Sequence, residues 1–257
     1  MELVDTHCHL HFADYFTEPN KVVAAAKEAG VTRLINIGTS LKDSKKAVNF
    51  AQSEDGVWAT AGVHPHDASN FLAQVNSVKI LERLLSQPKV VAVGEIGLDY
   101  YRNRSPKEDQ EKALRAQLET GLKMGLPFVF HVRDAWSDFW KIIDDYKGIA
   151  GVAHSFNSGL ADLDKVLTRG LYVALNGIMT FTKNESQLEA AKAVPLNKLV
   201  IETDAPFLAP VPFRGKTCEP KHVAVIADFL ANLRGEEPEH LARITTQNAT
   251  NLFGLET

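Results

Sequence analysis

The chain has 257 residues, 45% of them hydrophobic and 23% charged, which are the proportions of an ordinary soluble globular protein. Its formal net charge of −4 provides no general attraction to nucleic acid or membranes, so local cations or a metal must hold any anionic substrate. The two cysteines are too few for a disulfide framework, and neither a signal-peptide pattern nor an apolar run of ~18 residues is present, so we expect a soluble cytoplasmic protein.

Short apolar runs alternate with helical patterns along the whole chain. The expected strands cover residues 3–9, 33–38, 57–63, 90–95, 128–131, 149–153, 171–175 and 199–202. The expected helices cover residues 19–30, 41–53, 72–87, 105–125, a segment from residue 134, 159–169, 184–193, 219–233 and 238–252. Ser105, Pro106 and Glu108 have the spacing of a capping box at the start of the fourth helix.

The strands are apolar on both faces, which is typical of a parallel sheet covered by helices. Eight strand–helix units in roughly 250 residues predict an α/β protein with the fold of a (β/α)8 TIM barrel. No linker or shift in composition divides the sequence, so we expect a single domain over residues 1–257 with extra helices at its C-terminal end. A doubly wound open sheet is the alternative, and it fits less well because no glycine-rich phosphate loop follows the first strand.

Ionisable residues gather where the predicted strands end. His7 and His9 are two residues apart, so their side chains point to the same face of the opening strand. Further members lie at or after later strands: His64, Glu95, His131, His154 and Asp204. Because the C-terminal ends of all barrel strands lie on one rim, we expect these side chains to converge in space. His222 and His240 fall on the terminal helices and are interpreted as surface or packing residues.

When His64 is left out, this set contains four imidazoles and two carboxylates. That number exceeds the three protein ligands that a single catalytic zinc takes. Two metal ions that share a carboxylate would use all six. The ordinary alternative is a set of buried histidines bonded to the backbone. That alternative is reasonable for one residue, but it explains poorly why all six occupy the same position relative to a strand.

Six segments of the sequence resemble the signature blocks of the TatD family of metal-dependent hydrolases. They follow one another in order along nearly the whole chain: Asp5–Leu10, Gly62–His66, Gly94–Tyr100, His131–Asp134, His154–Phe156 and Glu202–Pro210. The resemblance implies a TIM barrel of the amidohydrolase superfamily that acts as a metal-dependent deoxyribonuclease. It implies metal ligation by the residues His7, His9, Glu95, His131, His154 and Asp204, with Glu95 bridging two ions.

Four further residues are candidates for binding the substrate. His64 is a rim residue that could contact the phosphate or the leaving oxygen, and Arg133 offers a bidentate fork for phosphate. Arg214 and Lys216 lie in the loop after the eighth strand, where this fold commonly holds phosphate, although a solvated turn explains them equally well.

Three positions depart from the family pattern. His11 stands where many members have aspartate, Phe213 where histidine is frequent, and Cys218 where asparagine is frequent. We interpret His11 as a rim residue and not as a ligand.

The expected reaction is hydrolysis of a phosphodiester, with DNA, in particular a single-stranded end, as the partner. Two divalent ions (Mg, Zn, Mn or Ni) would lower the pKa of water toward neutrality. Asp204 would orient the attacking water and take its proton, and the family resemblance favours 3′-to-5′ exonuclease action. Two alternatives stay open: amidohydrolase-type cleavage of an amide, lactone or aminoacyl ester, and a non-catalytic metal-binding scaffold.

Overall fold

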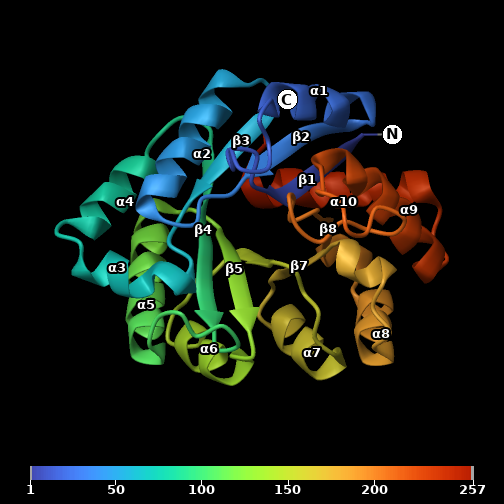
Figure 1. The fold of residues 1–257 in the computed structure, drawn as a ribbon. Helices are drawn as coiled ribbons and strands as arrows, with labels where there is room; N and C mark the ends of the chain where they lie inside the picture. Colours follow the sequence, from blue (N-terminus) through green and yellow to red (C-terminus); the bar gives the residue numbers. More distant parts are fainter. Residues whose placement is uncertain (1, 256–257) are drawn as a thin grey trace. The chain divides into compact units, whose positions relative to one another are not determined.

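The computed structural model of the chain describes residues 2–255. Eight strands and their helices alternate along the chain, as Figure 1 shows in colours that run from blue to red. Contacts group the chain into two compact units: the first unit comprises residues 2–36, 54–57 and 155–255, and the second unit comprises residues 37–53 and 58–154. The expectation of one domain stays a prediction. Within residues 2–255, every helix is too short or too polar to span a lipid bilayer.

The first unit contains four strands in the order β7 (Tyr172–Leu175), β8 (Leu199–Ile201), β1 (Leu3–Cys8) and β2 (Val31–Asn36). The pairs β7–β8 and β1–β2 are parallel, and a parallel bridge between Cys8 and Ala205 joins the ends of β1 and β8. The helices of this unit are α1 (Pro19–Glu28), α7 (Leu160–Thr168), α8 (Glu185–Ala193), α9 (Val223–Arg234) and α10 (Pro238–Phe253), with 3-10 turns η2 (Gly177–Thr180), η3 (Leu196–Lys198) and η4 (Pro220–His222). The two predicted C-terminal helices are therefore present as α9 and α10.

The second unit contains four strands that pair in chain order: β3 (Val57–Ala61, apart from its first residue), β4 (Val90–Asp99), β5 (Phe128–Arg133) and β6 (Gly151–Ala153). All three pairings are parallel. The helices of this unit are α2 (Leu41–Ser53), α3 (Ala68–Ala73), α4 (Ser77–Leu85), α5 (Lys107–Met124) and α6 (Trp136–Ile143), with the 3-10 turn η1 (Pro65–Asp67).

The strands are buried along most of their length. Every residue of β1, β6 and β8 is buried, and in β4 the last eight residues are buried. Burial on both faces is what a parallel sheet beneath helices requires. Eight parallel strands alternating with helices are the (β/α)8 barrel fold that the sequence predicts, so the predicted fold class is confirmed.

The boundary of β4 differs from the prediction in a way that matters for the site. Glu95 does not end the strand, because β4 continues to Asp99 with Ile96 to Asp99 paired with β5. The register shifts between Val93 and Ile96, and irregularities of this kind re-aim side chains next to active sites. Gly97 approaches His131 so closely that a Cβ atom there would lie 1.9 Å from the carbonyl oxygen of His131.

Two local predictions in the second unit are wrong. The helix expected over residues 72–87 is two helices, α3 and α4, because the backbone is extended at Gln74 and left-handed at Asn76, with φ of 60°. The capping box at Ser105 is absent, and α5 begins at Lys107 without a side-chain cap. Instead, the Ser105 hydroxyl donates to the carbonyl oxygen of His66 at 3.0 Å.

Candidate metal centre

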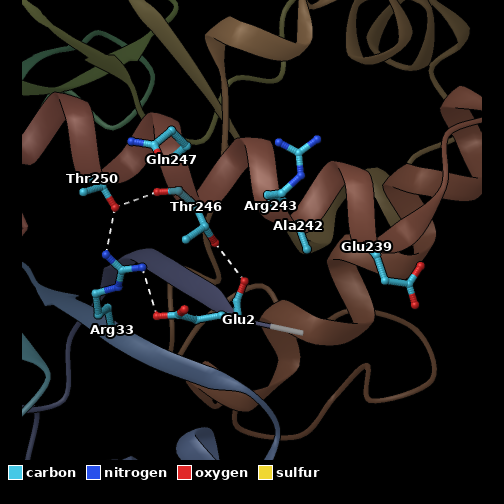
Figure 2. Close-up of a pocket in the computed structure, with 8 residues that line it drawn as sticks. All are labelled: Glu2, Arg33, Glu239, Ala242, Arg243, Thr246, Gln247 and Thr250. Carbon is cyan, nitrogen blue, oxygen red and sulfur yellow. Dashed lines mark hydrogen bonds and ion pairs between the residues drawn. The ribbon is translucent and has the colours of Figure 1, made fainter. Parts of the chain in front are cut away.

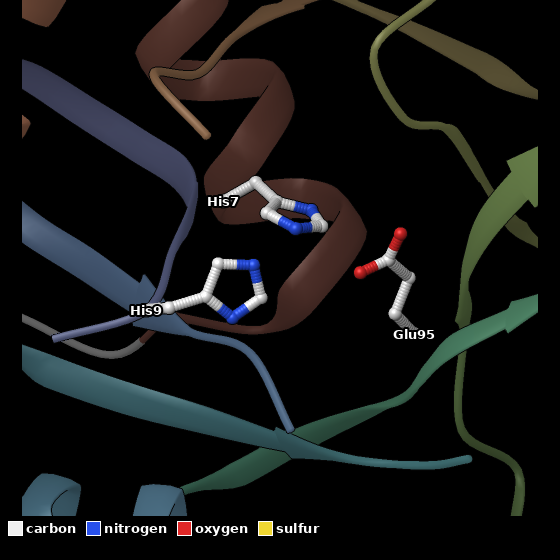
Figure 3. Close-up of side chains that lie close together, drawn as sticks. All are labelled: His7, His9 and Glu95. Carbon is white, nitrogen blue, oxygen red and sulfur yellow. The ribbon is translucent and has the colours of Figure 1, made fainter. Parts of the chain in front are cut away.

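The first unit brings together His7, His9 and Asp204, which we call the first donor group. His7 lies in β1, His9 follows the end of that strand, and Asp204 follows β8. Figure 3 shows the two imidazole rings side by side, with centroids 5.1 Å apart, and also draws Glu95 of the second unit. The Nε2 atoms of His7 and His9 lie 3.7 and 3.6 Å from Oδ1 of Asp204. Two imidazoles and one carboxylate are a suitable ligand set for a divalent transition metal.

Asp5 holds the strands that carry the first donor group, and we did not predict this role. Its carboxyl group accepts hydrogen bonds from the backbone N–H and the hydroxyl of Thr203, at 2.9 and 2.6 Å. Burial raises the pKa of Asp5 to about 8, against the hydrogen bonds from Thr203, which lower it. Asp5 lies in the same segment as His7 and on the same face of β1, and this spacing is the signal that could have identified it.

A second buried carboxylate of the first unit, Glu202, was also missed. Its Oε1 atom accepts hydrogen bonds from the backbone N–H of Ser155 at 2.8 Å and from the side-chain amide of Asn176 at 3.1 Å. Glu202 therefore connects the end of β8 to the loops that follow residues 154 and 175.

The second unit brings together three histidines around Glu95, and we call these four residues the second donor group. Oε1 of Glu95 lies 2.8 Å from Nδ1 of His131, 3.6 Å from Nε2 of His64 and 3.7 Å from Nε2 of His154. Ligand atoms of His64, Glu95 and His131 all lie within 4.8 Å of one another, which is compatible with a shared ion. The chemistry of the donor set therefore fits a divalent metal in this unit as well.

The predicted substrate residue His64 is thus part of the histidine–carboxylate group itself. Burial, together with the neighbouring charge of His131, holds the pKa of His64 well below its usual range. The neutral imidazole that results is the form that binds a metal or accepts a proton.

Asp99, at the end of β4, holds two histidines. Its Oδ2 atom lies 2.8 Å from Nε2 of His66 and 3.2 Å from Nε2 of His131. Burial raises the pKa of Asp99, but the hydrogen bonds from His131 and His66 outweigh it and hold the pKa well below the usual range. For His131, burial acts to lower the pKa, but the hydrogen bonds to Asp99 and Glu95 outweigh burial, so the pKa of His131 is raised.

Asp99 was missed because we expected β4 to end at Glu95. In a strand that continues past Glu95, every second residue lies on the same face, so Asp99 shares a face with Glu95 and Gly97. This period of two is the signal that could have identified Asp99. A carboxylate behind a ligand histidine fixes its tautomer and orientation.

The three predicted cations differ in their surroundings. The Arg133 guanidinium lies 4.0 Å from the ring centroid of the exposed Tyr101. Arg214 lies 3.8 Å from the ring centroid of Phe181 and donates to the carbonyl oxygen of Ala209 at 3.1 Å, whereas Lys216 is exposed. Arg214 is therefore held by contacts with Phe181 and Ala209.

The family departures Phe213 and Cys218 both contact His222. The rings of Phe213 and His222 stack with centroids 4.4 Å apart, and the Cys218 sulfur lies 3.6 Å from Nδ1 of His222. His222 is buried and its Nδ1 accepts the backbone N–H of Glu219 at 3.1 Å, so its interpretation as a packing residue is confirmed. His240 is exposed, as expected for a surface residue.

A separate pocket in the first unit contains none of the predicted site residues (Figure 2). Arg33, from β2, donates to Glu2 at 3.0 Å and to Thr250 of α10 at 2.8 Å. Because the charge of Arg33 is balanced by Glu2, this pocket is interpreted as part of the packing between β2 and α10.

Comparisons with known proteins agree with these observations. The family model described as TatD related DNase matches residues 4–254. The chain is 34% identical over 253 residues to the uncharacterized metal-dependent hydrolase YabD of Bacillus subtilis, covering 98% of each chain. It is 35% identical over 260 residues to the 3'-5' ssDNA/RNA exonuclease TatD of Shigella flexneri, covering 98% of this chain and 99% of that protein.

Among solved structures, YJJV, a TatD homolog from Escherichia coli, has a TM-score of 0.90 and 26% identity, covering 99% of this chain and 98% of the other. A TatD family hydrolase from Entamoeba histolytica shares the fold, with a TM-score of 0.89, 24% identity and coverage of 98% of each chain. The resemblance noted in the sequence is thereby confirmed, and the chain belongs to the TatD related DNase family.

Proposed function

We propose that this protein is a metal-dependent nuclease that hydrolyses phosphodiester bonds at single-stranded nucleic acid ends in the 3′-to-5′ direction. The observation that carries the proposal is the pair of donor groups, each with histidines around a carboxylate, in a chain of the TatD related DNase family. The relative named 3'-5' ssDNA/RNA exonuclease supports the choice of substrate and polarity.

The proposed centre takes two divalent ions, held by His7, His9, Glu95, His131, His154 and Asp204. The first donor group would hold one ion, and Glu95 with His131 and His154 of the second donor group would hold the other. When bound, the ions act as Lewis acids and lower the pKa of water toward neutrality. The imidazoles suit zinc or nickel, and the carboxylates together with a substrate phosphate suit magnesium or manganese.

Side chains of the protein perform the remaining steps. Asp204 orients the attacking water and accepts its proton, since its carboxylate lies beside the imidazoles of His7 and His9. Neutral His64 contacts the phosphate or the departing oxygen. Arg133, Arg214 and Lys216 offset the negative charge of the phosphodiester.

We also propose that the protein works in the cytoplasm. Cys8 and Cys218 are free and buried, and burial raises the pKa of both thiols. Free thiols of this kind are typical of a reducing compartment.

Amidohydrolase-type cleavage of an amide, lactone or aminoacyl ester is the less supported alternative, because a close relative over the full length is named as an exonuclease. A substrate panel separates the two. Protein stripped of metal and reloaded with Mg, Mn, Zn or Ni is tested on 5′-labelled single- and double-stranded oligonucleotides, and on a dihydropyrimidine, a lactone and an aminoacyl-tRNA. We expect a ladder of products shortened from the 3′ end of single strands. Turnover of only the small molecules or the aminoacyl ester would contradict the proposal.

A further inference from the structure

Three aromatic side chains cluster in the first unit, and we call Phe12, which is half-buried, and the exposed Tyr15 and Phe207 the aromatic platform. The ring centroids of Tyr15 and Phe207 are 5.6 Å apart, and those of Phe12 and Phe207 are 6.4 Å apart. Tyr15 is 49% exposed and Phe207 is 40% exposed, and among the phenylalanine, tyrosine and tryptophan side chains of residues 2–255 only Tyr101, at 58%, is comparably exposed. Grouped exposed apolar side chains mark binding sites more often than isolated ones do.

The aromatic platform is attached directly to the first donor group. The ring of Phe12 stacks on the ring of His9, with centroids 4.6 Å apart and planes 15° apart. Phe207 follows Asp204 in a tight turn, in which the Phe207 N–H donates to the carbonyl oxygen of Asp204 at 2.8 Å. The rings of His9 and Phe207 are 6.3 Å apart. A molecule that lies on these rings therefore lies next to the residues proposed to act on the substrate.

The charges around the aromatic platform favour a base over a phosphate. Asp14 lies between Phe12 and Tyr15 in the sequence, and Glu18 follows in the same segment, where it pairs with Lys21 at 2.7 Å. The Asp14 carboxylate repels a phosphate backbone but not an uncharged aromatic ring, whereas Lys21 offsets the charge of Glu18. Bases in single strands are unpaired and stack on aromatic side chains with little dependence on sequence.

We infer that Phe12, Tyr15 and Phe207 form a stacking platform for the unpaired nucleobase next to the phosphodiester that is cleaved. This inference rests on the proposed function and names the part of the substrate that this surface binds. The platform would select single-stranded ends, because a base held in a duplex does not present its free face to the protein.

The test compares binding and cleavage of oligonucleotides that differ only at the 3′ end. One set carries 2-aminopurine, whose fluorescence falls on stacking, at either of the last two positions, with phosphorothioate linkages that resist hydrolysis. The other set carries an abasic residue at the same positions. Phe207→Ala and Tyr15→Ala are the test variants, and Phe207→Trp should restore stacking. Leu160→Ala removes a comparably exposed side chain (48%) from α7 of the same unit and serves as the matched control.

We expect quenching of 2-aminopurine by the wild-type protein at one of the two positions, and a loss of affinity of about 5- to 100-fold in Phe207→Ala. The abasic oligonucleotide should bind the wild type weakly and lose no further affinity in the variant. Equal behaviour of Phe207→Ala and Leu160→Ala would overturn the inference, as would a change from dimer to monomer caused by Phe207→Ala in sedimentation. If the wild type cleaves single strands without preferring a terminal base, only the platform is refuted. If it neither binds nor cleaves them, the proposed function is refuted as well.

Discussion

Oδ2 of Asp99 lies 3.2 Å from Nε2 of His131, on the opposite side of the imidazole from Glu95. His131 is therefore held between two carboxylates, one at each ring nitrogen. Only one of these carboxylates is a proposed metal ligand. Asp99 fixes the orientation of the His131 ring and makes the other ring nitrogen a stronger metal ligand.

Replacing Asp99 by asparagine should weaken metal binding without abolishing it. The loss of this partner is expected to lower metal affinity by about 10- to 100-fold, because the ring loses its orientation and part of its basicity. Competition with a fluorescent chelator measures the affinity, and Asp164→Asn on the exposed face of α7 is the control. Unchanged affinity in Asp99→Asn would show that His131 does not depend on this contact.

Because the donor residues form two groups, we expect that mutation of one group halves the metal content of the protein. The double variant His7→Ala with His9→Ala should retain one divalent ion per chain, since it removes two of the three residues of the first donor group. Metal analysis by mass spectrometry, compared with the exposed variant His240→Ala, gives the count. Loss of both ions, or of neither, is incompatible with separate groups.

Replacement of Arg214 should affect stability, whereas replacement of Lys216 in the same loop should affect substrate binding. Arg214→Ala should lower the free energy of unfolding by about 0.5–1 kcal/mol, since its guanidinium lies over Phe181 at an exposed site. Lys216→Ala should leave stability unchanged and raise KM for oligonucleotides, more strongly at low salt. Urea denaturation and steady-state kinetics make the comparison. Stability lost through Lys216→Ala but not through Arg214→Ala would contradict it.

His222 should contribute to a loss of stability at low pH. Burial is the main cause that holds the pKa of His222 below the ordinary value of a histidine, so the unfolded chain takes up the proton more readily than the folded one. Stability should fall as the pH drops below about 6.5, by at most about 1.4 kcal/mol per pH unit for one such group. Protonation also places a hydrogen on Nδ1, which accepts the Glu219 N–H.

His222→Asn keeps an acceptor for Glu219 and removes the titration. Its free energy of unfolding should therefore decline less than that of the wild type between pH 8 and pH 5.5. His240→Asn controls for the loss of one histidine. Parallel curves for His222→Asn and the wild type would refute the assigned role.

The sequence predicts most of the fold and most of the donor residues, because strand periodicity and strand ends are local properties. The spacing of His7 and His9 places both side chains on one face, and the structure confirms this. The same spacing leads from Glu95 to Asp99, but it applies only because β4 continues past Glu95, and that continuation depends on pairing with β5. Ser105 was misread for the same reason: its partner is the carbonyl oxygen of His66, which is distant in sequence.

The most direct test of the central claim is single-turnover cleavage of a 5′-labelled single-stranded oligonucleotide by metal-loaded protein and by Asp204→Asn. Both proteins must first show the same circular dichroism and melting curve, so that a difference reports chemistry and not folding. We predict stepwise shortening from the 3′ end by the wild type and a loss of at least about 100-fold in rate for Asp204→Asn, as expected when a general base is removed. Retained cleavage by rigorously purified Asp204→Asn, or no cleavage by the wild type with any of the four metals, would contradict the account.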